Sequence, residues 1–97
     1  MKYENAKEFN TELKRVFKFM GFKVKVRIIN SYNFPKCWVD VGCMEGTFPN
    51  ELRLAMFDCQ GLDRKNLINE NDVNYGNIGD KWVAMSVGNW EKLVENL

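Results

Sequence analysis

The residue types that most often carry out chemistry are either missing from this chain or spaced unfavourably. The sequence contains no histidine, which removes the commonest general base and the commonest metal ligand. Its three cysteines, Cys37, Cys43 and Cys59, lack the paired spacing of a structural zinc site. Because free cysteine is among the most buried residue types, we interpret them as buried free thiols. We therefore expect no metal and no cofactor.

The carboxylates form no recognisable catalytic pattern. Asp58 and Asp63 are five residues apart around the end of a predicted helix, and Asp72 and Asp80 lie in a long polar segment. The spacing places no two carboxylates on one face beside a nucleophile or a cation, and the sequence has no glycine-rich phosphate-binding motif. The sequence therefore predicts a protein that is not an enzyme.

The chemistry that the sequence does offer is that of a basic, aromatic surface. Residues 22–29 read FKVKVRII, so Lys23, Lys25 and Arg27 alternate with apolar side chains. Alternation of this length is typical of a half-buried β-strand, which would place three cations in a row on the exposed face of a sheet. Cations beside exposed aromatic rings are what proteins use to bind single-stranded nucleic acid. An ordinary solvated sheet face is the alternative explanation.

Periodicity predicts the elements that must position this strand. Helices are expected at residues 4–20, 48–59 and 90–97, and strands at 22–29, 37–43 and 81–87. Asn5 or the two residues before it would begin the first helix, with Thr47 and Asn89 as candidate N-caps of the other two. Gly21 and Gly61 are suited to end the first two helices, because glycine readily adopts positive φ.

The first two strands are expected to pair as an antiparallel hairpin with a seven-residue loop. Trp38 and Asp40 would then share the exposed face with the three cations, and Asp40 could neutralise one of them by a cross-strand pair. Trp82 would join this face if the third strand turned Ala84 and Ser86 outward.

Residues 61–80 are polar and rich in asparagine and glycine, with a short strand suggested at Val73–Tyr75. A loop of this length inside a compact domain is often functional. The order helix, strand, strand, helix, strand, helix predicts a single α+β domain over residues 1–97. It would be a two-layer sandwich, with an antiparallel sheet of three to four strands and helices on one face. The other sheet face would be open to solvent.

Composition and charge narrow the class of protein further. The chain of 97 residues is 45% hydrophobic, enough for one core, and no apolar run is long enough to span a membrane. Its N-terminus is polar and resembles no secretory signal, so we expect a cytoplasmic protein. Net charge is +1, but residues 1–36 carry a balance of +6 and residues 37–97 a balance of −5. Such asymmetry indicates one basic and one acidic face, unless the two halves interleave and their fields cancel.

Several short motifs resemble the small domains of large polyvalent proteins from phages and conjugative elements. The leading segment of those domains is matched by Leu13-Lys14 and by residues 23–27, KVKVR. Their FDGxxD segment is matched by residues 57–63, FDCQGLD, and their closing strand by Tyr75-Gly76 and Val83. The chain departs from the pattern after the arginine, where NSYNFPK replaces a turn rich in serine and glycine. The resemblance implies an accessory or anti-defence role in a mobile element, and it carries over no catalytic residue.

These observations predict a non-enzymatic binding protein of a phage or mobile element, acting in the host cytoplasm. We favour a protein partner, in the concrete form of a host defence complex that is inhibited. Nucleic acid bound to the basic, aromatic sheet face is the alternative, and a homodimer is a third hypothesis. The candidate binding residues are Lys23, Lys25, Arg27, Tyr32, Phe34, Trp38, Arg64, Lys65, Tyr75 and Trp82.

Overall fold

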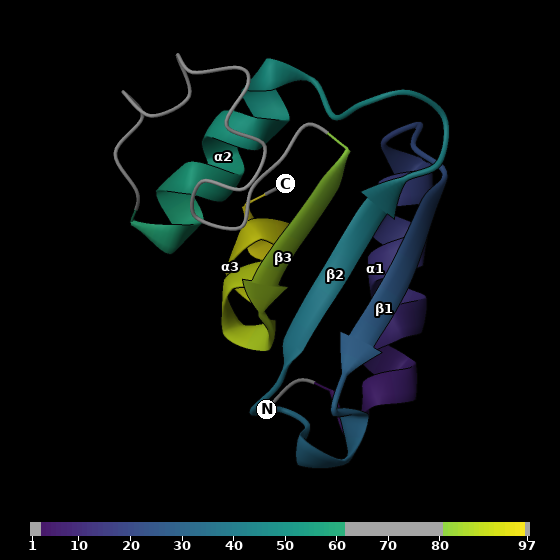
Figure 1. The fold of residues 1–97 in the computed structure, drawn as a ribbon, viewed down its shortest axis with the longest axis vertical. Helices are drawn as coiled ribbons and strands as arrows, with labels where there is room; N and C mark the ends of the chain where they lie inside the picture. The colour runs from purple at the N-terminus through teal and green to yellow at the C-terminus, as the bar shows by residue number, and fades with distance from the viewer. Residues whose placement is uncertain (1–2, 62–80, 97) are drawn as a thin grey trace.

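The computed structural model describes residues 3–61 and 81–96. Within them the elements are α1 (Ala6–Phe19), β1 (Val24–Ile29), a 3₁₀ turn (Ser31–Asn33), β2 (Trp38–Cys43), α2 (Asn50–Gln60), β3 (Trp82–Ser86) and α3 (Val87–Glu95), as Figure 1 shows. This order confirms the predicted α+β class. None of the described helices combines the length and the apolar character needed to cross a membrane.

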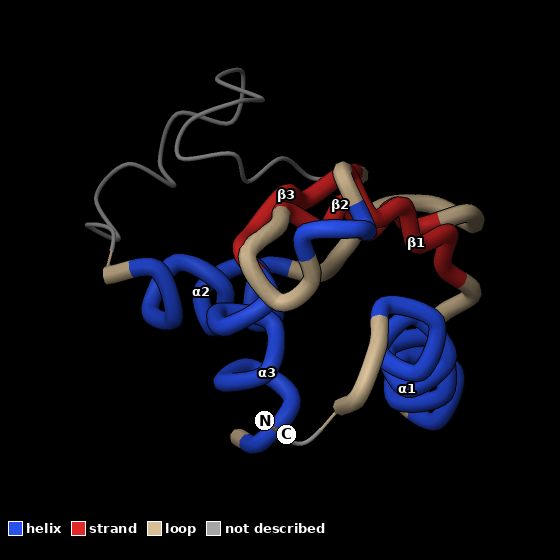
Figure 2. Tube along the Cα trace, turned by 90° about the horizontal axis from the view of Figure 1, so that it is seen from below, coloured by secondary structure: helices blue, strands red, loops and turns tan. Residues whose placement is uncertain are grey.

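The three strands form one antiparallel sheet in which β2 is central, with β1 and β3 on either side. The hairpin of β1 and β2 is therefore confirmed. Figure 2 shows α1 and α3 on the same side of the sheet, with α2 beside α3. The fold is thus a two-layer arrangement in which one face of the sheet carries the helices.

The core lies between the sheet and these helices, and Trp90 is its largest side chain. Trp90 is 0% exposed and packs edge-on against Phe17 of α1, with ring centroids 6.0 Å apart. Its indole N–H donates a hydrogen bond of 2.9 Å to the backbone carbonyl of Val39, in the central strand. This bond satisfies the only polar group of the indole, so α3 is fixed to β2 without an unpaired buried donor.

Helix α1 begins and ends as the sequence predicts. The side chain of Asn5 accepts a hydrogen bond from the amide of Glu8, which makes Asn5 the N-cap. At the other end Gly21 has a φ of +95°, and the amide of Phe22 donates to the carbonyl of Phe17. These are the features of a Schellman motif, in which glycine takes the left-handed position that ends the helix.

The predicted start of α2 is wrong. Thr47 is not its N-cap, because the helix begins at Asn50 and the N-cap is Pro49 in an extended conformation. Phe48 is buried in the core, and a residue that precedes proline is disfavoured in helical conformation. Both features disfavour a helix that begins at Phe48. Its predicted end at Gly61 is confirmed, with a φ of +69°.

The predicted start of α3 is also wrong. The helix begins at Val87 rather than Trp90, and its N-cap is Ser86, whose side chain accepts a hydrogen bond from the amide of Asn89. Asn89, the predicted cap, lies instead in the first turn. Val87 is fully buried and continues the inward alternation of Val83 and Met85, and the helix begins directly at this residue.

Candidate macromolecular interface

The face of the sheet opposite α1 and α3 carries some of the residues that the sequence singled out, namely Lys25, Arg27, Trp38 and Trp82. The strand register aligns them in three rows, each crossing from β1 through β2 to β3. The rows are Lys25, Gly42 and Trp82; Arg27, Asp40 and Ala84; and Ile29, Trp38 and Ser86. The prediction that Trp38 and Trp82 share one face with the cations is therefore confirmed. We call the nine residues of these rows the open face.

Arg27 and Trp82 meet across the central strand. The guanidinium carbon of Arg27 lies 5.2 Å from the centre of the Trp82 ring, within cation–π range. The two residues belong to β1 and β3, so the contact spans the width of the sheet. It is made possible by Gly42 in β2, because a Cβ built at position 42 would lie 2.6 Å from the indole. The glycine thus leaves the space over which the ring extends.

Asp40 does not form the predicted cross-strand ion pair with Arg27. Its backbone stands directly opposite Arg27 in the register, as expected for a cross-strand pair. Yet no ion pair joins these two described side chains, and the guanidinium lies over Trp82 instead. A planar guanidinium stacks well on an aromatic ring, whereas an exposed ion pair adds little stability in water.

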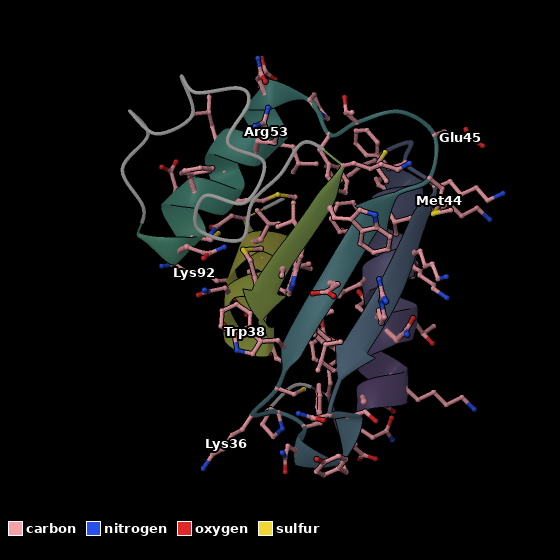
Figure 3. All side chains as sticks on the ribbon, in the orientation of Figure 1. Lys36, Trp38, Met44, Glu45, Arg53 and Lys92 are labelled. Carbon is pink, nitrogen blue, oxygen red and sulfur yellow. The ribbon has the colours of Figure 1, made fainter. Side chains whose placement is uncertain are left out.

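The aromatic candidates differ in how accessible they are. Trp38 is 47% exposed on the open face, near the end of β3 (Figure 3). Tyr32 is 83% exposed in the loop between β1 and β2. Phe34 belongs to the packing of the core instead, with its ring 5.7 Å from that of Phe9. The remaining candidates, Arg64, Lys65 and Tyr75, lie outside the described residues.

The structure also adds residues that the sequence did not single out. Ile29 extends the apolar part of the open face and is 41% exposed, in keeping with its period-two position after Arg27. Gly42 is the other addition. A glycine inside a strand that otherwise alternates regularly often marks close approach of another group, and this signal was present in the sequence.

Cys37 and Cys43 are buried as predicted, whereas Cys59 is only half-buried. Burial raises the pKa of the Cys37 thiol. Burial also raises the pKa of Cys59, to which nearby Asp58 adds while Lys92 acts in the opposite direction. Both shifts favour the protonated, unreactive thiol. Within residues 3–61 and 81–96, no three histidine, cysteine or acidic side chains gather in a way that could hold a metal ion.

Comparison with known proteins adds no family to this description. No protein-family model, no curated protein and no solved structure matches the chain. The resemblance to domains of polyvalent phage proteins therefore stays a prediction from its motifs.

Proposed function

We propose that this chain is a binding domain that docks a protein partner on its open face. The observation that carries the proposal is the contact of Arg27 with Trp82 above Gly42, beside the exposed ring of Trp38. Tryptophan and arginine are the residue types most enriched among the side chains that dominate protein–protein binding energy. Here they are held on rigid strands, so little conformational entropy is lost when a partner binds.

The contacts that Trp82 already makes favour a protein rather than nucleic acid as the partner. Its ring lies against Gly42 and already carries the Arg27 guanidinium. A nucleic-acid base would have to displace this arginine in order to stack on the ring. The guanidinium would then lose its favourable cation–π contact. Ile29 and Trp38 offer further apolar area on the third row. Apolar and aromatic area of this kind suits the core of a protein interface.

The motifs of the sequence add a narrower form of this proposal. Their resemblance to domains of phage and conjugative-element proteins supports a partner that belongs to a host complex, such as a defence complex that the chain inhibits. The small size of the chain and its two-signed charge distribution suit such a role.

Site-specific photo-crosslinking tests the proposal. A benzoylphenylalanine in place of Trp38 would report on the open face, and the same residue in place of Phe19, which is 89% exposed on α1, is the matched control. In cells that produce the chain naturally, we expect position 38 to crosslink one protein in a stoichiometric band that position 19 does not give. Equal crosslinking from both positions, no band, or a band that is only the chain itself would contradict the proposal.

Nucleic-acid binding is the second candidate function. The alternating cations Lys23, Lys25 and Arg27 favour it. All three are exposed along β1 and the residue before it. A twelve-nucleotide oligothymidine tests it by mobility shift at low salt. A shift that weakens with salt and disappears in the double variant Lys25→Glu, Arg27→Glu would establish it. An unshifted oligonucleotide would exclude it.

A further inference from the structure

The outer edge of β1 presents unpaired backbone groups. The amide of Met44 donates a 2.8 Å hydrogen bond to the carbonyl of Lys23, which makes these residues a hydrogen-bonded pair. In an antiparallel ladder such pairs alternate, so Lys25 and Arg27 also bond to β2. The backbone N–H and C=O groups of the residues between them, Val24, Val26 and Ile28, therefore point away from the sheet. No described residue pairs with this edge.

Two separate hollows lie beside this edge, between β1 and α1. A hollow of about 470 Å³ opens at the start of the strand, lined by Lys18, Phe22 and Val24 among others. A second, of about 420 Å³, opens at its end against Thr11 and Ile28. An exposed strand edge beside pockets that accept alternate side chains is the arrangement by which proteins add a peptide as an extra strand.

Positive charge borders the edge on both sides. On β1 and the residue before it, the exposed cations are Lys23, Lys25 and Arg27. On α1, the cations that line the two hollows are Lys7, Lys14 and Lys18. Among the described residues, Glu45 is the only acidic one that lines either hollow, and it follows the C-terminal end of β2 (Figure 3). The positive balance of residues 1–36 is thus gathered largely around one edge of the sheet.

This charge selects the kind of segment that the edge accepts. Lysines on an edge strand repel the same edge of a second copy, which protects the sheet from self-association. An acidic segment would meet no such repulsion. Because side chains of an added strand alternate between the two sides of the sheet, acidic groups on either side would lie near cations of β1 or of α1.

We infer that β1 pairs with an extended, acidic segment of the protein partner, which becomes the fourth strand of the sheet. This inference rests on the proposed function and specifies how the partner binds. The backbone of Val24, Val26 and Ile28 supplies the ladder, and the lysines of α1 and β1 select negative charge.

A synthetic peptide of four Val-Glu repeats tests the inference with the whole chain. Hydrogen exchange of the backbone amides is measured by NMR. At saturating peptide, we expect exchange at Val24, Val26 and Ile28 to slow by about tenfold or more. The same peptide with glutamine in place of glutamate should bind about tenfold more weakly. An N-methylated peptide of unchanged charge should give no protection, because it cannot donate to the ladder.

A matched pair of variants tests the charge. Lys18 and Lys92 both lie in the last turn of a helix, but Lys92 is on α3 at the opposite side of the molecule (Figure 3). Lys18→Glu should weaken peptide binding about three- to tenfold, whereas Lys92→Glu should leave it unchanged. Equal effects of the two variants would overturn the inference.

Three further results would also overturn it. They are unprotected β1 amides, equally tight binding of a Val-Lys peptide, and stronger protection of the same amides by an eight-nucleotide oligothymidine. The proposed function fails by a different measurement, the loss of specific crosslinking from position 38. Crosslinking at position 38 without protection of β1 would retain the open face as the interface and reject only strand addition.

Discussion

The indole of Trp82 lies against Gly42 of the neighbouring strand so closely that a Cβ at position 42 would be 2.6 Å from the ring. Real Cβ atoms do not approach a ring atom to this distance, so any side chain at position 42 would move the indole. Because the ring also carries the Arg27 guanidinium, the space left by one glycine allows side chains from both outer strands to meet over the central strand.

Gly42→Ala is therefore expected to destabilise the fold through Trp82. Position 42 is buried in the central strand, where alanine itself is tolerated, so the cost arises from displacing the ring. We expect a loss of about 1–3 kcal/mol in the free energy of unfolding, measured with urea. In a Trp82→Ala background the same change should cost about 0.5 kcal/mol or less. A Gly42→Ala cost that is equal in both backgrounds would show that the indole is not its source.

The strands and their faces followed from the sequence because period-two alternation directly determines which side chains share a face. Residues 22–29 and 37–43 were predicted within two residues of β1 and β2 for this reason. The starts of α2 and α3 were predicted less well. At Thr47 and Asn89 the local patterns offered a cap, but the caps in the structure are Pro49 and Ser86, and where each helix begins is decided together with its packing in the tertiary structure.

The composition of the open face was predictable, but its central contact was not. Lys25, Arg27 and Trp38 follow from the alternation of two adjacent strands. The contact of Arg27 with Trp82 depends on β2 lying between β1 and β3, and local patterns do not specify strand order. The two hollows beside β1 were also missed, because each combines residues at the strand edge with residues of α1.

The two candidate caps of α3 can be told apart by substitution. Ser86→Ala removes the hydroxyl that accepts from the amide of Asn89, and should cost about 1 kcal/mol in the free energy of unfolding. Asn89→Ala keeps the backbone amide that donates to Ser86, so it should cost about 0.5 kcal/mol or less in the free energy of unfolding. Urea titrations of the two variants provide the comparison. The reverse order of costs would mean that Asn89 is the working cap.

Trp90→Phe tests the bond that holds α3 to the central strand. The variant loses the 2.9 Å hydrogen bond to Val39 and leaves a void in the core, so we expect a loss of about 2–4 kcal/mol in the free energy of unfolding. Trp38→Phe is the matched control, because that ring is half exposed, and it should cost about 1 kcal/mol or less. Chemical unfolding measures both. Similar losses in the two variants would contradict the anchoring role of Trp90.

The buried thiols should make stability fall at alkaline pH. Burial raises the pKa of Cys37 and of Cys59, so the folded state favours the protonated thiols more than the unfolded state does. The stability that these two thiols contribute is fully present below the ordinary thiol pKa of about 8.5. It is lost as pH rises through the higher pKa values of the folded state. The free energy of unfolding should therefore decline as pH rises above about 8.5. The decline should be shallower in the double variant Cys37→Ala, Cys59→Ala. Tyr3, whose pKa is also raised by burial, is controlled by Tyr3→Phe. An unchanged slope in the cysteine variant would show that these thiols are not the groups that titrate.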